Sequence, residues 1–160
     1  MTPRQEQVAK VLTEVATQLS QVVTAWGFAF HADEVRSSHG GPFASGHFCR
    51  ETTRIGISCR DTLDNLNYEH TFVTRRGSST ESERFTIGHA TLMAGVGHAQ
   101  DCHLISSGEM PSSMIARDSS NPVEALLHDL TILAEPVLSA PCDEFFAIMR
   151  RGYRSYNVTY

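Results

Sequence analysis

The chain has 160 residues, of which 41% are hydrophobic and 19% are charged, and its formal net charge is -5. This composition excludes a disordered chain and is typical of one folded domain, which we expect to span residues 1–160. The acidic balance argues against binding to duplex DNA, because duplex binders usually carry a basic stripe. No apolar run reaches the roughly 18–20 residues of a membrane span and no signal-peptide core is recognised, so we expect a cytoplasmic protein with no membrane partner.

The first predicted element is a long amphipathic helix. Apolar residues recur at three- and four-residue steps from Val8 to Trp26, which corresponds to about six helical turns. Thr2 and Pro3 form a typical helix start, and Gly27 is typical of a helix end.

Four strand-like runs follow and are joined by short connections. We expect these strands at 28–35, 44–50, 54–60 and 66–73. Short connections between consecutive strands are typical of an antiparallel meander. The two middle runs form a hairpin in which we expect Cys49 to pair with Ile55.

This pairing decides the two faces of the hairpin, because successive side chains of a strand point to opposite faces. Ile55 and Ile57 are then buried. Arg50, Arg54 and Arg60 share the open face. Phe48 is predicted to be an aromatic residue on the same open face.

The region after the fourth strand is less regular. Residues 75–83 are polar and predict a mobile loop. Residues 84–97 predict a helix, although glycines in this range lower the helix propensity. Residues 98–120 predict irregular structure, either a lid or a long connection.

The C-terminal region is predicted to be helical. Asn121 and Pro122 are a typical cap and first residue of a helix, which we expect to run over 122–138 with a kink or an end at Pro136. A short helix follows at 143–151, and the arginine- and tyrosine-rich residues 149–160 are expected to form a flexible tail along a partner. Such a mixture can also stack on single-stranded nucleic acid, which stays open as an alternative.

These elements predict an α+β fold. We expect a four-stranded antiparallel meander sheet with the long N-terminal helix and the C-terminal helices packed on one face.

Loose motifs in this chain resemble a family of small uncharacterised bacterial single-domain proteins. The motifs are Phe43-x-x-Gly46-x-Phe48-x-Arg50, Arg54-Ile55-x-Ile57-x-x-Arg60-x-x-Leu63, Leu66-x-Tyr68 and Asn121-Pro122-x-x-Ala125-Leu126-x-x-Asp129-Leu130. The resemblance covers about residues 28–150 and implies the same fold, a bacterial source and no particular activity. This chain departs from the family at Gly56, where the family tends to have a bulky residue, so the open face is expected to be bare at that point.

One candidate binding surface combines the open sheet face with the glycine-rich loop at residues 37–46, which comes before the hairpin. Guanidinium groups on a rigid face can grip carboxylates or phosphates, and arginine with an aromatic residue is the usual composition of an interface hot spot. The loop offers small residues and backbone donors where a ligand can approach. The candidate binding residues are Phe48, Arg50, Arg54, Arg60, His39, Gly40 and Gly41.

A second candidate site is a cluster of potential zinc ligands. His98 and Cys102 are four residues apart, which would place them on one face of a helix, and His89 could add a third ligand. No HExxH or CxxC motif accompanies them, so we expect no cofactor, with zinc kept as the alternative.

These patterns favour a non-enzymatic module that binds a protein or an acidic ligand, of an immunity type or a regulatory type. The alternative is a metal-dependent hydrolase that uses the histidine and cysteine cluster, so enzymatic activity stays open. We expect a protein partner, and a homodimer remains a further alternative.

Overall fold

The computed structural model describes residues 1–107, 113–118 and 121–157. Its four α-helices are α1 (Pro3–Val23), α2 (His89–Gly95), α3 (Pro122–Leu133) and α4 (Cys142–Asn157). Short helical turns lie at Thr24–Trp26 and Ala99–Asp101, and a π-helical turn at Ala134–Leu138 continues α3. None of the helices in these ranges is long and apolar enough to cross a membrane.

The fold is α+β with an antiparallel sheet, as the sequence predicts, but the sheet has six strands rather than four. The strands are β1 (Ala29–Ala32), β2 (Arg36–Ser38), β3 (Gly41–Arg50), β4 (Thr53–Cys59), β5 (Leu63–Arg76) and β6 (Ser79–Gly88). Their order is β1-β3-β4-β5-β6, and β2 pairs with the other end of β3. A separate two-stranded ribbon consists of β7 (Leu104–Ser106) and β8 (Met114–Ala116).

The long N-terminal helix is confirmed. Thr2 caps it through a reciprocal pair of hydrogen bonds with Gln5, and Pro3 occupies its first turn. Gly27 follows at a φ of +84°, a conformation that favours glycine and ends the helical segment.

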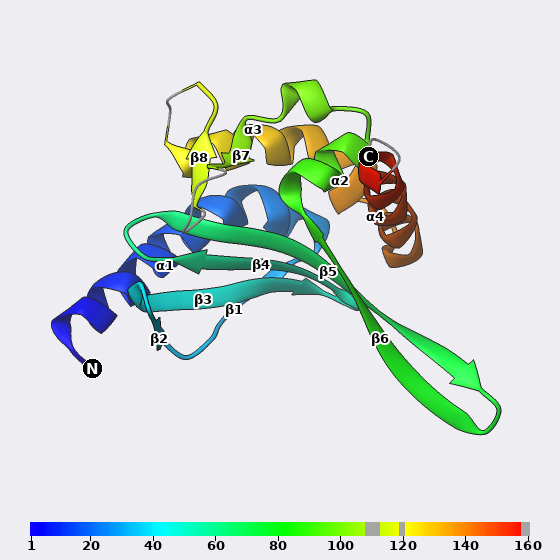
Figure 1. Ribbon diagram of the computed structural model, residues 1–160, viewed down its shortest axis with the longest axis horizontal. Helices are drawn as coiled ribbons and strands as arrows, with labels where there is room; N and C mark the ends of the chain where they lie inside the picture. The colour runs from blue at the N-terminus through cyan, green and yellow to red at the C-terminus, as the bar shows by residue number, and fades with distance from the viewer. Residues whose placement is uncertain (108–112, 119–120, 158–160) are drawn as a thin grey trace.

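The helices lie on one side of the sheet and the core lies between the two layers (Figure 1). The apolar stripe of α1 contributes Val8, Leu12 and Leu19 to this core, where they meet Ile55 and Ile57 of β4. The opposite side of the sheet carries no helix of the described chain.

The predicted hairpin exists, but its register differs by one residue from the predicted register. Phe48 pairs with Ile55 and Cys49 pairs with Arg54, because the turn has two residues, Glu51 and Thr52, rather than three. The predicted faces are therefore right for β4 and inverted for β3, since a slip of one residue exchanges the two faces of a strand.

This register corrects two predicted positions. Phe48 lies in the core with 1% of its surface exposed, not on the open face. Arg50 lies on the same side of β3 as Phe48, toward the helices, and so does not share a face with Arg54.

Residues 75–83 are a β-hairpin and not a loop. β5 continues to Arg76, Gly77 turns the chain at a φ of +64°, and β6 returns to Gly88. The predicted helix at 84–97 is therefore half strand, and only His89–Gly95 is helical.

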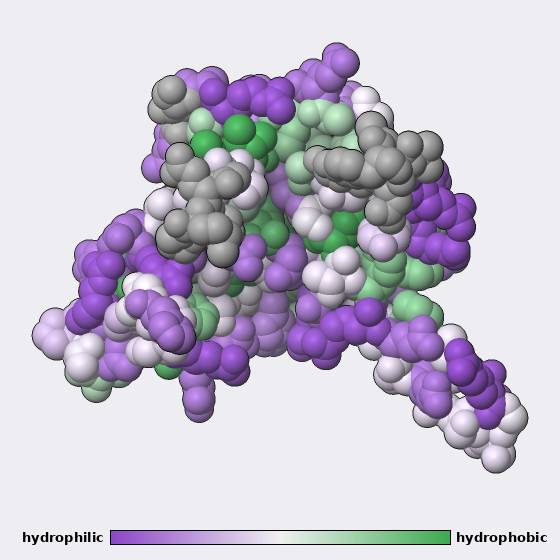
Figure 2. Space-filling model, in the orientation of Figure 1, coloured by the Kyte–Doolittle hydropathy of each residue, from purple (hydrophilic) through white to green (hydrophobic). Residues whose placement is uncertain are grey.

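The outer half of this hairpin, residues 71–84, is here called the arm. Its pairs run without a bulge from Thr71 opposite Arg84 to Arg76 opposite Ser79. β4 ends its pairing with β5 at His70, so both edges of the arm are unpaired within the described chain. Figure 2 shows the arm as a polar projection beyond the body, and Figure 1 shows it running away from the helical layer.

The C-terminal residues differ from the predicted tail as far as the structure describes them. Residues 149–157 form the second half of α4, and 158–160 lie outside the described residues. α2 and α4 pack very closely at Gly95 and Gly152, where a Cβ on Gly152 would lie 2.3 Å from the carbonyl oxygen of Thr91. Of the predicted irregular region 98–120, residues 108–112 and 119–120 also lie outside the described residues.

Candidate functional site

The three arginines of the predicted binding surface lie in three different environments. Arg50 points toward the helices and binds backbone carbonyls where α1 and the π-helical turn end. Its guanidinium donates to the carbonyl oxygen of Trp26 at 3.2 Å, to that of Ala140 at 2.7 Å and to that of Leu138. It also stacks over the ring of Phe28 at 4.6 Å. Arg50 therefore has a structural role, because its N–H groups donate hydrogen bonds to backbone carbonyls at helix ends.

Arg60 lies beside the glycine-rich loop at one end of the sheet. It forms an ion pair with Asp64 and donates a hydrogen bond to the Ser38 hydroxyl at 3.0 Å. A Cβ on Gly40 would lie 3.3 Å from its guanidinium, so glycine allows this close approach. The structure thus brings together Arg60 and Gly40, two of the predicted binding residues.

The predicted loop is a tight turn between β2 and β3, and the remaining candidate residues lie at its two ends. His39 is exposed, and Gly41 begins β3 at a φ of +90°. Arg60 also borders a cavity of about 540 Å³ between the sheet end, the start of α2 and the β7–β8 ribbon. Ser58, Thr91 and Ser106 add hydroxyl groups to the wall of this cavity.

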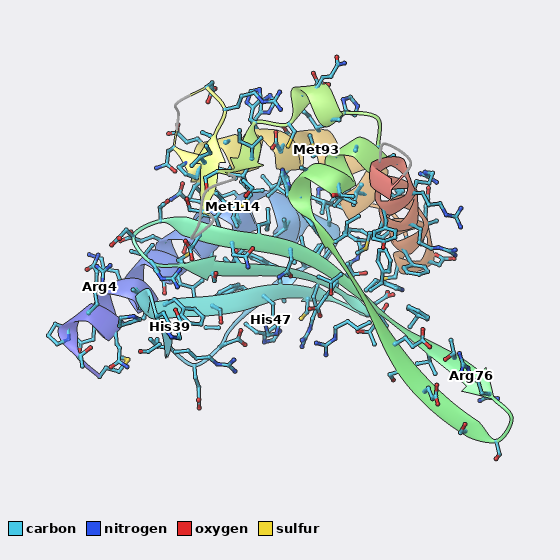
Figure 3. All side chains as sticks on the ribbon, in the orientation of Figure 1. Arg4, His39, His47, Arg76, Met93 and Met114 are labelled. Carbon is cyan, nitrogen blue, oxygen red and sulfur yellow. The ribbon has the colours of Figure 1, made fainter. Side chains whose placement is uncertain are left out.

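Arg54 is the predicted arginine that does lie on the open face. Its row across the sheet contains Cys49 of β3, Glu69 of β5 and Thr86 of β6. The neighbouring row contains His47, Gly56 and Asn67. Figure 3 shows His47 on the side of β3 away from the helices.

A shallow hollow of about 300 Å³ lies on this open face. Gly56 lies at this hollow, and a Cβ there would lie 2.6 Å from the Asn67 side-chain oxygen, so the Asn67 side chain occupies the space that a side chain at position 56 would need. The wall residues are almost all polar: Asp33, Ser45, His47, Arg54, Ser58, Asn65, Asn67 and Glu69, with Phe43 beside them.

Two of the three charged side chains that line the hollow, Asp33 and Glu69, have a partner. Asp33 lies 3.4 Å from the His47 ring nitrogen, and Glu69 lies 3.5 Å from Arg84. Arg54 lines the hollow without an ion-pair partner among the described residues. The Glu69 oxygen that faces Arg84, Oε1, is inaccessible to solvent. The hollow therefore presents one cation, Arg54, that has no ion pair within the described residues.

A second polar cluster lies inside the core, around Asp129 of α3. Tyr68 of β5 contacts His89 Nδ1 at 2.8 Å, and His89 Nε2 contacts Asp129 Oδ2 at 2.8 Å. The same carboxylate accepts hydrogen bonds from the backbone N–H groups of His103 and Leu104, both at 2.9 Å. The carboxylate thus joins α3 to α2 and to the segment at His103 and Leu104, and His89 extends the contact to β5.

The protonation of this cluster follows from the Asp129 carboxylate. Burial alone would raise the pKa of Asp129, but hydrogen bonds from His89, Leu104, His103 and His128 outweigh burial and lower it to about 2. Because an ionised carboxylate only accepts, the Nε2 atom of His89 carries a proton, and in neutral imidazole Nδ1 accepts from Tyr68. Burial, with Asp129 nearby, raises the pKa of Tyr68, so the hydroxyl keeps its proton.

The predicted zinc ligands are only partly brought together. His89 and Cys102 meet at Asp129, whereas His98 lies at the surface and pairs with Asp101 at 2.8 Å. Burial and the Asp129 charge raise the pKa of the Cys102 thiol to about 12, and the thiol donates to the Leu104 carbonyl at 3.1 Å. The donors and acceptors of this cluster thus satisfy one another, which is the arrangement of a structural hydrogen-bond network.

A further pair of histidines covers the outer side of Asp129. The rings of His103 and His128 stack at 3.6 Å with an interplanar angle of 2°, and His128 lies 3.2 Å from Asp129 Oδ1. Lone pairs of an imidazole lie in its ring plane, so two parallel rings do not direct them at a common ion. His89 and Cys102 were candidates from the sequence, whereas Asp129 and His128 were not.

Comparison with known proteins assigns neither a family nor a function to this chain. No family model matches the sequence, and neither a curated protein nor a solved structure matches it. The chain is thus placed in no family by these comparisons, and its resemblance to small bacterial proteins stays a prediction.

Proposed function

We propose that this chain is a non-enzymatic binding module whose open sheet face recognises a protein partner. The observation that carries the proposal is the unpaired Arg54 guanidinium in a hollow on a sheet face that no helix of the described chain covers. A charge held on a rigid strand and lacking a partner is available for an acidic group of another molecule.

The composition of the hollow supports a polar partner. Asn65, Asn67 and Ser58 supply side-chain donors and acceptors at regular strand spacing. Such alternating groups match the donors and acceptors of a polypeptide better than an apolar small molecule, for which pockets are mostly lined by apolar side chains.

The alternative of a metal-dependent hydrolase has weaker support. Its candidate ligands His89 and Cys102 are 3% and 2% exposed, and their hydrogen bonds are already made inside the protein. A hydrolytic metal centre needs an open coordination position that substrate can reach. Stoichiometric zinc in the purified protein would favour this alternative.

Affinity capture with matched variants tests the proposal. Tagged wild-type protein, Arg54→Glu, Arg54→Gln and Arg151→Glu are used as baits in extracts of the cells that make the protein. Arg151 is exposed on α4, so its reversal gives the same change in net charge away from the open face. Circular dichroism and thermal melting establish that each bait is folded.

We expect the wild type and Arg151→Glu to retain one dominant partner, and both Arg54 variants to lose it. Arg54→Gln removes the charge without placing a second carboxylate opposite Glu69, so a loss in this folded variant cannot come from repulsion within the sheet. A partner that both Arg54 variants retain would overturn the proposal. A wild-type bait that captures only what an unrelated bait captures would also overturn it.

A further inference from the structure

The arm continues the open face of the sheet beyond the body of the molecule. Glu69 lies in the hollow next to Arg54, and the alternation of β5 then places Thr71, Val73 and Arg75 on the same side of the strand. The twist of a two-stranded ribbon turns this side gradually but leaves it continuous. The hollow and the arm therefore form one elongated surface.

The two sides of the arm differ in charge. The side that continues the open face carries Arg75 and Arg84. The other side carries Arg76 together with Glu81 and Glu83. Arg84 pairs with Glu69, so Arg75 joins Arg54 as a cation on the open side without an ion pair in the described chain.

The same side also carries an exposed apolar residue. Val73 is 60% exposed, which makes it one of the few large hydrophobic side chains at the surface of the described protein. Along β5 it lies between Glu69, which is opposite Arg54 of β4, and Arg75. Interface anchors combine apolar contact with arginine, and such an arrangement suits a complementary protein surface.

We propose that the arm is part of the recognition surface and that the partner contributes an acidic polypeptide segment lying along β5 from Glu69, which is opposite Arg54 of β4, to Arg75. This inference rests on the proposed function of the open face. Six residues of strand separate Glu69 from Arg75, which corresponds to roughly 20 Å. The segment places one acidic group at each arginine and an apolar side chain against Val73.

Charge complementarity selects this partner over a nucleic acid or a basic protein. Arg54 and Arg75 are both cations without an ion pair in the described chain, whereas the chain as a whole has a net charge of -5. A polyanion such as RNA would be repelled by the acidic body beyond the local contact. A single acidic segment can meet the two arginines without covering the acidic remainder of the protein.

Adjacent arginines of the arm provide a matched test. Arg75 and Arg76 are neighbours in β5 but point to opposite sides, so Arg75→Glu and Arg76→Glu change the net charge equally. The probe is a ten-residue glutamate peptide, and a ten-residue lysine peptide is its control. Binding is followed by amide chemical shifts of the isotope-labelled protein at low ionic strength.

We expect the glutamate peptide to shift amides along β4 and the β5 half of the arm. Arg75→Glu should weaken binding by at least about fivefold and Arg76→Glu by less than about twofold. Val73→Ser should leave this glutamate probe bound, because the peptide offers no apolar side chain, but should weaken capture of the cellular partner.

Equal effects of Arg75→Glu and Arg76→Glu would overturn the inference, because they would mean that only overall charge matters. Peptide shifts confined to the hollow, or no binding of the glutamate peptide, would overturn it as well. These outcomes are distinct from a failure of the proposed function, which is decided by whether the Arg54 variants lose the captured partner.

Discussion

The polar groups of the Asp129 cluster are buried and hydrogen-bonded, whereas those of the arm are exposed. At Asp129, a carboxylate with no exposed surface takes hydrogen bonds from two other segments of the chain. Along the arm, Arg75 and Val73 are exposed and contact little of the rest of the molecule. Residues that could bind a metal can therefore have all of their hydrogen bonds inside the protein. The exposed side chains of a polar hairpin, in contrast, remain available to a partner.

The largest expected effect is at Asp129. Asp129→Asn should lower the free energy of unfolding by about 3–5 kcal/mol, because the buried donors around it lose their charged acceptor. Urea denaturation at neutral pH measures this change. Asp101→Asn, which alters an exposed carboxylate beside His98, is the control and should change stability little. If both variants unfolded at the same urea concentration, the Asp129 network would not be structural.

The lowered pKa of Asp129 predicts how the stability of the protein depends on pH. Its folded pKa of about 2 is below the unfolded value of about 3.9, so its contribution to stability is present above pH 4. The contribution is lost as the pH falls through about 2, and Asp129→Asn should remove this part of the acid unfolding.

The sequence predicts the buried faces of β4 and α1 but not the register of β3. The buried aliphatics of β4 and the stripe of α1 were predicted correctly, because a periodic apolar pattern reports which face is buried. The register of β3 could not be predicted in this way. It depends on a two-residue turn with Glu51 at a φ of +49°, which the residue type does not suggest.

Two features of the sequence point to structure that the apolar pattern does not show. Gly77 followed by Ser78 is typical of a two-residue hairpin turn, which here joins β5 to β6. Asp129 lies within the apolar stripe of its helix, between Leu126 and Leu130, which indicates a buried carboxylate. Its partner His89 is 40 positions away and only the folded chain brings it close.

The second largest effect is expected where α2 meets α4. Gly152→Ala should cost about 1–3 kcal/mol, because the added methyl would collide with the Thr91 carbonyl and force the helices apart. Gly88→Ala is the control, since a Cβ at Gly88 meets no atom within 4 Å. Thermal unfolding compares the two, and equal melting temperatures would contradict the close packing of α2 and α4.

Shortening the arm should have a smaller effect on stability and a larger one on binding. Replacing residues 74–81 by Asn-Gly joins Val73 to Ser82, which are opposite each other in the sheet. The free energy of unfolding should change by less than about 1 kcal/mol, because a two-stranded projection adds little to the core. The shortened protein should still lose most of its captured partner, and a folded variant that binds normally would separate the arm from function.

The smallest effect concerns His70, at the junction of the two regions. Burial lowers the pKa of His70, although Asp143 opposes the shift. The unfolded chain therefore takes up a proton first as the pH falls below about 6.5, and stability decreases toward the lower folded pKa. His70→Gln should remove this part of the pH dependence, and an unchanged slope between pH 7 and pH 5 would contradict it.

The most direct measurement of the central claim is hydrogen exchange of the protein with and without its captured partner. If the open face and the arm form the recognition surface, exchange should slow in residues 53–59 and 71–84 and stay unchanged in α1 and α3. Protection confined to α1, α3 or the residues around Asp129 would contradict the account.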